Sequence, residues 1–149
     1  MLHRDFREFV SFLNAQSVEF LLVGGWALAA HGRPRATGDI DFWIRRTPEN
    51  IQRLLLAISD FGFGSLRLDA SHFGADSVVQ FGRPPLRIDL LTSLSGVEFD
   101  ACWSRRVSVV FGDIELQVIG VDDLKINKLA TGREQDQLDV KQLEHGRKR

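Results

Sequence analysis

Residues 22–44 have the sequence LVGGWALAAHGRPRATGDIDFWI, in which two glycines follow an apolar run and two aspartates begin another. The apolar, partly β-branched residues 18–23 predict a buried strand, and residues 26–32 predict a short helix. Gly24 and Gly25 fall between the two. The first N–H groups of a helix have no backbone partners and carry partial positive charge, and glycine lets an anion approach them. The glycines therefore form either an ordinary turn or a phosphate-binding one.

Asp39 and Asp41 lie in a second predicted strand, residues 39–44, where side chains two apart share one face. They are either the polar face of an edge strand or a pair that holds a cation, since hard divalent metals such as Mg²⁺ favour carboxylate ligands. A third aspartate, Asp89, interrupts the apolar segment LRIDLL, where an unpaired carboxylate is costly. It either pairs with Arg87, caps a turn, or joins Asp39 and Asp41 in a three-carboxylate metal site.

The rest of the pattern predicts an α/β (α+β) fold, a mixed β-sheet flanked by helices. Apolar residues at helical spacing predict a helix over residues 3–16, and Thr47-Pro48 predicts the start of a helix that ends near Gly62. Further strands are predicted at residues 78–81, 86–91, 107–111 and 114–119, and closing helices at about 121–130 and 134–145. We expect one domain over residues 1–149, with its core at about 18–119 and its closing helices at about 121–145.

The composition excludes some classes of function but does not specify one. The chain has 149 residues, 44% hydrophobic and 26% charged, with a net charge of −1, so no global field attracts nucleic acid. One cysteine excludes an intrachain disulfide and a cysteine metal cluster. The N-terminus does not have the pattern of a signal peptide, and no apolar run is long enough to span a membrane. We expect a soluble cytoplasmic protein with no membrane partner.

The motifs resemble the nucleotidyltransferase superfamily typified by DNA polymerase beta. Its pattern is hydrophobic-Gly-Gly/Ser, a spacer, Asp-hydrophobic-Asp, and a third Asp on a later strand. The Gly-Gly-Trp-Ala form is similar to the branch of small antibiotic nucleotidyltransferases and nucleotidyltransferase-like toxins of abortive-infection systems. The segment DDLKINKLATGREQDQLDVKQLE, residues 122–144, resembles the second motif of those toxins, a lysine on one helix and then Arg, Asp and Asp leading into the next. The resemblance covers about residues 18–44 and 84–145.

The resemblance implies a role for each matching residue. Gly24 and Gly25 would hold triphosphate, Asp39 and Asp41 would bind metal, and Asp89 would complete the site and activate the attacking hydroxyl.

Four more polar residues belong to this implied site. Lys128 would approach phosphate as a point charge and Asp136 would orient it or an acceptor, although spacing alone favours an exposed helix face for Lys128. Arg35 and Thr37, just before the aspartate pair, could reach phosphate, and Arg35 could equally be a loop cation. Trp43 shares the strand face of the pair, where packing in the core is favoured over stacking on a base.

The implied activity is a metal-dependent nucleotidyltransferase that uses Mg²⁺ or Mn²⁺. An acceptor hydroxyl would attack the α-phosphate of a nucleoside triphosphate and release pyrophosphate. An RNA or tRNA 3′ end, a protein hydroxyl and a small molecule such as an aminoglycoside remain open as acceptors, as does a cognate protein partner in a toxin–antitoxin pair. One alternative is a catalytically silent binding partner with the same fold. Another is a metal-dependent nuclease, which would not need the Gly-Gly turn.

Overall fold

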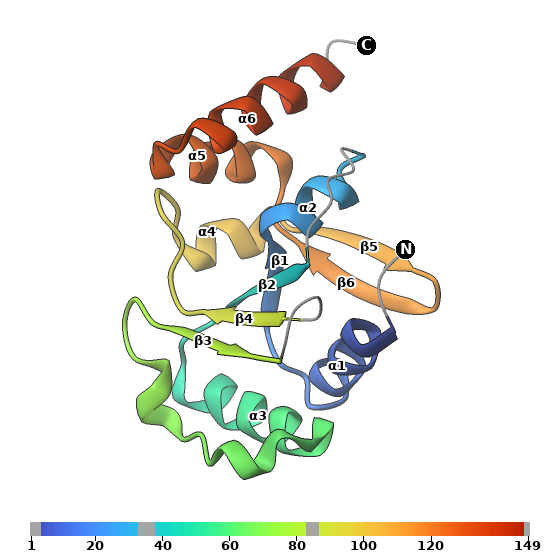
Figure 1. Ribbon diagram of the computed structural model, residues 1–149, viewed down its shortest axis with the longest axis vertical. Helices are drawn as coiled ribbons and strands as arrows, with labels where there is room; N and C mark the ends of the chain where they lie inside the picture. Colours follow the sequence, from blue (N-terminus) through green and yellow to red (C-terminus); the bar gives the residue numbers. More distant parts are fainter. Residues whose placement is uncertain (1–3, 33–37, 83–86, 148–149) are drawn as a thin grey trace.

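A six-stranded mixed sheet forms the centre of the computed structural model, which describes residues 4–32, 38–82 and 87–147 (Figure 1). The strands are β1 (Phe20–Val23), β2 (Asp39–Ile44), β3 (Val78–Phe81), β4 (Arg87–Leu91), β5 (Val107–Phe111) and β6 (Ile114–Val118). Their order across the sheet is β3-β4-β2-β1-β6-β5. The β2/β4 and β1/β6 pairs are parallel, and the other neighbouring pairs are antiparallel.

Helices cover both faces of this sheet. They are α1 (Arg4–Ala15), α2 (Gly24–Ala30), α3 (Pro48–Ile58), α4 (Phe99–Ser104), α5 (Val121–Thr131) and α6 (Glu134–Arg147), with short helical turns at Ser59–Phe63, Gly64–Leu66 and Ala70–Phe73. In Figure 1, α1 and α3 lie on one side of the sheet, and α2, α4, α5 and α6 lie on the other. Within the described residues, no helix is long and apolar enough to cross a membrane.

Side chains along β2 point alternately to the two faces of the sheet, and this alternation decides which face carries the aspartates. Phe42 packs against Phe9 of α1, with ring centroids 5.7 Å apart, so the even-numbered residues of β2 face α1 and α3. Trp43 points to the other face and packs edge-on against Phe99 of α4, at 5.1 Å between centroids. Asp39 and Asp41 share the face of Trp43 and therefore lie under the layer that contains α2, α4, α5 and α6.

The predicted fold class is confirmed. The strands appear where the apolar runs predict them, within one or two residues at each end. The short helix α4 and the helical turns at Gly64–Leu66 and Ala70–Phe73 were not predicted, because none of these segments has a clean periodic pattern. The domain bounds stay a prediction, and Arg35 and Thr37 lie outside the described residues.

Candidate active site

Parallel pairing brings the three predicted metal-binding aspartates onto two neighbouring strands. In the register of β2 and β4, Asp41 is opposite Asp89 and Asp39 is opposite Arg87. Paired residues point to the same face of a sheet, so two positions separated by nearly 50 residues in sequence become neighbours. Leu90 and Ile88, on either side of Asp89, point to the opposite face and are buried in the core.

The Asp41–Asp89 pair is electrostatically costly in the protein alone. Burial, a hydrogen bond with Asp89 and the charges of Asp89 and Asp39 raise the pKa of Asp41 from 3.8 to about 7, and Lys128 opposes the shift. Asp89 is 8% exposed, and its Oδ1 is a buried atom with no hydrogen-bond partner in the described part of the chain. A buried acceptor of this kind normally finds a partner. A bound cation would fill that role.

Asp39 is engaged differently. Nη2 of Arg87 donates to Oδ2 of Asp39 at 2.7 Å, whereas Nε of Arg87 is 4.0 Å from Oδ1 of Asp89. Arg87 thus makes its close contact with Asp39, the residue opposite it, and only a distant one with Asp89. Among the residues that the structure describes, no group of three or more His, Cys, Asp or Glu side chains is arranged to hold a metal ion.

Gly24 is a glycine because Asp41 occupies the space of its missing side chain. Its φ is +69°, and a Cβ placed there would lie 2.3 Å from Oδ2 of Asp41. Gly24 and Gly25 open α2 directly after β1, as the sequence predicts. The residue before them, Val23, provides no side-chain cap, so the first N–H groups of α2 keep their capacity to bind an acceptor. The Gly-Gly turn and the carboxylate pair therefore belong to one site.

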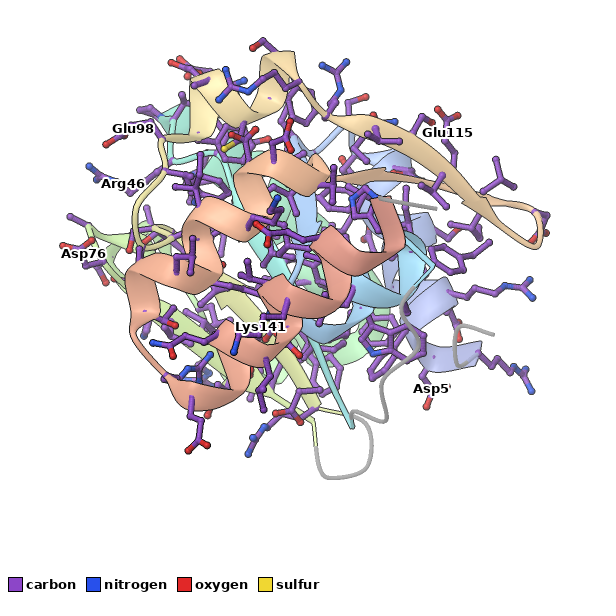
Figure 2. The ribbon with its side chains drawn as sticks, turned by 90° about the horizontal axis from the view of Figure 1, so that it is seen from above. Asp5, Arg46, Asp76, Glu98, Glu115 and Lys141 are labelled. Carbon is purple, nitrogen blue, oxygen red and sulfur yellow. The ribbon has the colours of Figure 1, made fainter. Side chains whose placement is uncertain are left out.

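Lys128 lies buried between two carboxylates of the next helix. Its side chain is 5% exposed, and Nζ is 3.2 Å from Oδ1 of Asp136 and 3.1 Å from Oδ2 of Asp139. The exposed helix face that spacing alone favours for Lys128 is wrong, because α6 packs on this face of α5. Seen from above, α5 and α6 lie over the strands (Figure 2). Lys128 reaches the aspartate site electrostatically, since its charge acts on the pKa of Asp41.

Asp136 is hydrogen-bonded to three neighbouring side chains. It accepts hydrogen bonds from Thr131 at 2.5 Å, Arg133 at 2.7 Å and Lys128 at 3.2 Å. Burial opposes its ionisation, but these hydrogen bonds and the charge of Lys128 outweigh burial and hold the pKa of Asp136 below its usual value. Asp139 was not predicted as a site residue, although its place three residues after Asp136 puts both on one helix face.

Comparison with known proteins identifies the family. Residues 3–144 match the family model described as "Nucleotidyltransferase of unknown function (DUF6036)". The chain belongs to this family. The resemblance to nucleotidyltransferases is thereby confirmed, and the match includes both the β2/β4 aspartates and the α5–α6 cluster. No curated protein matches the chain.

Two solved nucleotidyltransferase structures share the fold. A candidate nucleotidyltransferase from Thermotoga maritima superposes with a TM-score of 0.62 at 13% identity, covering 96% of this chain and 92% of the other. The lincosamide antibiotic adenylyltransferase LnuA, solved with lincomycin bound, gives a TM-score of 0.57 at 12% identity and covers 97% of both chains. At these identities the likeness establishes the shared fold.

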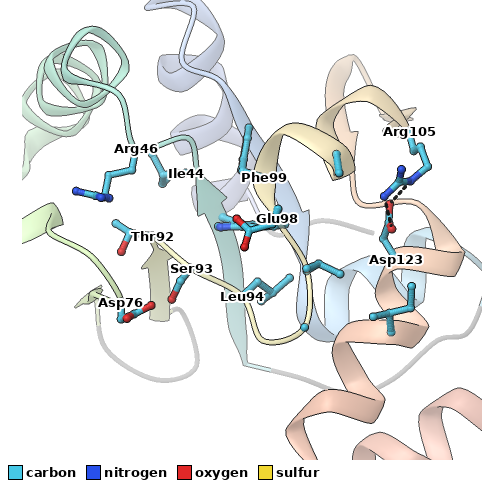
Figure 3. A pocket seen from close by; sticks show the side chains of 15 residues that line it. Ile44, Arg46, Asp76, Thr92, Ser93, Leu94, Glu98, Phe99, Arg105 and Asp123 are labelled. Carbon is cyan, nitrogen blue, oxygen red and sulfur yellow. Dashed lines mark hydrogen bonds and ion pairs between the residues drawn. The ribbon is translucent and has the colours of Figure 1, made fainter.

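A cavity of about 660 Å³ in this nucleotidyltransferase is lined by Asp76 and Asp123 but not by Asp39, Asp41 or Asp89 (Figure 3). It opens beyond the C-terminal ends of β2 and β4, where Arg46, Thr92 and Glu98 line it. On its far side Arg105 donates two hydrogen bonds to the buried carboxylate of Asp123, at 2.9 and 3.0 Å. Among the described residues that were predicted for the active site, none lines this cavity.

Two tryptophans near the motifs have packing roles. Trp43 is 2% exposed and is held by Phe99, which confirms packing in the core over stacking on a base. Trp26 of α2 meets Phe6 edge-on, at 6.3 Å between centroids.

Proposed function

We propose that the protein transfers a nucleoside monophosphate from a nucleoside triphosphate to a hydroxyl acceptor, with Mg²⁺ or Mn²⁺ held by Asp41 and Asp89. The observation that supports this most strongly is the in-register carboxylate pair, with the raised pKa of Asp41 and an Asp89 oxygen that lacks a partner among the described residues. Carboxylate oxygens are the ligands that Mg²⁺ prefers, so the residues fit the ion. We propose Asp39 as the third ligand of the metal ion.

A divalent cation held there would lower the pKa of the acceptor hydroxyl and offset charge on the phosphates during an in-line displacement. The protein's own groups supply position and charge. We propose that the carboxylate of Asp89 also accepts the proton of the attacking hydroxyl. The acceptor oxygen would then bond to the α-phosphorus as the bond from that phosphorus to the bridging oxygen breaks, and pyrophosphate would leave.

The Gly24-Gly25 turn is the proposed binding site for the triphosphate. Its N–H groups open α2 without a side-chain cap, and glycine keeps a Cβ away from Asp41. Arg35 and Thr37 are proposed as further phosphate ligands on sequence grounds. We propose that Asp136 holds Lys128 in place and that the positive charge of Lys128 stabilises the negative charge of the same phosphates.

A small molecule with a free hydroxyl is the first acceptor to test, because LnuA is a lincosamide adenylyltransferase of the same fold. That neighbour also makes ATP the first donor to test. RNA 3′ ends and protein hydroxyls, including those that a toxin would modify, are further acceptors to test in the same experiment. A protein partner of a toxin–antitoxin pair would appear as an inhibitor of the transfer.

A catalytically silent binding partner is the second candidate. The observation that favours it is the ion pair between Arg87 and Asp39, which occupies one of the three proposed ligands.

The test is transfer of label from each nucleoside triphosphate labelled at the α-phosphate, with Mg²⁺, to small hydroxyl compounds, RNA and the proteins of a cell extract. We expect one acceptor class to be labelled, and no transfer from the γ-labelled donor. Asp89→Asn should abolish the labelling, whereas Asp113→Asn, at the tip of the exposed β5–β6 hairpin, should leave it unchanged. Equal labelling by Asp89→Asn and the wild type would refute the proposed site.

A further inference from the structure

We propose that Arg87 is the resident counter-ion of the carboxylate site, displaced from Asp39 when a divalent metal binds and then used to hold the triphosphate. This inference rests on the proposed function, because it assigns a further residue to the same site. Arg87 is neither one of the acidic ligands nor part of the Gly-Gly turn. It would be a positioning residue in the metal-free protein and a substrate-binding residue in the loaded one.

The register of the strands places Arg87 at the edge of the site. As the first residue of β4, it lies opposite Asp39 and two residues before Asp89. Its Nη2 is 2.7 Å from Oδ2 of Asp39. The two side chains are 37% and 34% exposed, so the guanidinium can leave Asp39 without disturbing the packed core. An ion pair this exposed is weak enough to be exchanged for another partner.

The charges near the site explain why a cation is needed there. Asp39, Asp41 and Asp89 place three carboxyl groups within electrostatic reach of one another. Lys128 is nearby, but Asp136 and Asp139 already engage its Nζ. Arg87 contacts two of these carboxylates: its Nη2 is 2.7 Å from Oδ2 of Asp39, and its Nε is 4.0 Å from Oδ1 of Asp89. Arg87 therefore offsets the charge that a metal ion would offset.

Arg87 also has N–H donors that Asp39 does not use. Its Nε is buried and makes no hydrogen bond to any residue described in the structure, so the guanidinium does not use its full set of donors on Asp39. A planar guanidinium has five N–H donors, and its fork fits two phosphate oxygens at once. A metal ion on Asp39 repels Arg87, and a triphosphate arriving at the Gly24 turn attracts it.

This exchange predicts opposite effects on two ligands. Without Arg87, a metal ion no longer competes with the guanidinium for Asp39, so metal alone should bind more tightly. A triphosphate loses a charged partner and should bind more weakly. A purely structural role for Arg87 predicts a different pattern, in which both affinities and the stability of the fold fall together.

The experiment is calorimetric titration of the metal-free protein with Mn²⁺ alone, and then of the Mn²⁺-saturated protein with α,β-methylene-ATP. We compare wild type, Arg87→Met and the control Arg106→Met. Arg106 is exposed just before β5, the edge strand on the other side of the sheet from β4, and its guanidinium lies 4.0 Å from the Trp103 ring centroid, so its loss removes the same charge elsewhere on the sheet. Thermal melting in chelator verifies that each variant is folded.

For Arg87→Met we expect Mn²⁺ to bind tighter by on the order of fivefold, the upper range for one exposed ion pair. The nucleotide should bind at least about tenfold more weakly, as for a lost hydrogen bond to a charged group. Arg106→Met should match the wild type in both titrations. Unchanged or weaker Mn²⁺ binding by Arg87→Met, with normal binding by the wild type, would overturn the proposed role of Arg87 but not the proposed metal site.

A wild type that does not bind Mn²⁺ would instead overturn the proposed metal site, so the two failures are distinguishable. Arg87→Lys keeps the inference testable if Arg87→Met does not fold. It preserves the charge and removes the fork. We expect wild-type Mn²⁺ affinity and weakened nucleotide binding from it, and wild-type nucleotide binding would refute the role of the guanidinium.

Discussion

Gly24→Ala should lower the stability of the protein and its affinity for metal through one contact, and a matched control variant can separate the effect of that contact. A Cβ at this position would lie 2.3 Å from Oδ2 of Asp41 and 3.2 Å from its Cγ, so the carboxylate must move. Alanine must also adopt a φ of +69°. Gly112 is a matched control, because its φ is +65° and a Cβ there meets nothing within 4 Å. The two substitutions share the backbone strain and differ in the clash with Asp41.

The expected magnitudes follow from these two terms. A left-handed backbone costs an alanine roughly 1–2 kcal/mol, and this cost applies to both variants. Forcing Asp41 off its rotamer adds about 0.5–1.5 kcal/mol in Gly24→Ala alone. A chain of this size loses about 2–4 °C of Tm per kcal/mol, so Gly24→Ala should melt roughly 1–6 °C below Gly112→Ala. The displaced carboxylate should also weaken Mn²⁺ binding in Gly24→Ala and leave it intact in Gly112→Ala.

Thermal melting in chelator and calorimetry with Mn²⁺ measure the two effects. The double variant Gly24→Ala/Asp41→Ala removes the atoms that clash, so against Asp41→Ala the new alanine should cost no more than in the control. If Gly24→Ala and Gly112→Ala have the same Tm and the same Mn²⁺ affinity, the contact between Gly24 and Asp41 does not shape the site.

Three further predictions concern the charged residues. Asp41→Asn should abolish transfer yet melt in chelator at or above the wild-type temperature, because it relieves repulsion; a much lower Tm would mark Asp41 as a structural acceptor. Since the pKa of Asp41 rises from 3.8 to about 7, the native state binds the extra proton between these values, and metal-free stability should fall as the pH rises from about 4 to 7. Urea unfolding should show this slope in the wild type and a smaller one in Asp41→Asn, and equal slopes would contradict the raised pKa. Lys128→Met removes the buried cation that Asp136 and Asp139 share and should cost about 3–5 kcal/mol in urea unfolding, whereas the exposed Lys141→Met should cost almost nothing. A cost below about 1 kcal/mol for Lys128→Met would show that the buried pairs are not needed for stability.

The sequence predicts the β2/β4 aspartates because strand periodicity is local and strict. Asp39 and Asp41 must share a face whatever the rest of the chain does. An aspartate in the middle of an apolar strand is conspicuous, as Asp89 is. That Asp41 lies opposite Asp89 depends on the register between β2 and β4, which is a long-range property and which no local pattern specifies.

The partners of the cations were harder to predict for the same reason. Arg87 has two acidic candidates, Asp89 on its own strand and Asp39 across the sheet, and the register decides for Asp39. Lys128 is at a position that helical spacing makes exposed, and only the packing of α6 buries it. The same packing brings Asp139 within 3.1 Å of Nζ of Lys128.

The central claim is that Asp41 and Asp89 together hold the catalytic metal. The most direct measurement is the anomalous difference density of crystals grown with Mn²⁺ and α,β-methylene-ATP. We predict one strong peak between the two carboxylates, with Oδ1 of Asp89 as a ligand and the triphosphate over the Gly24-Gly25 turn. No peak at Asp41 and Asp89, with the two carboxyl groups still hydrogen-bonded to each other, would contradict the claim.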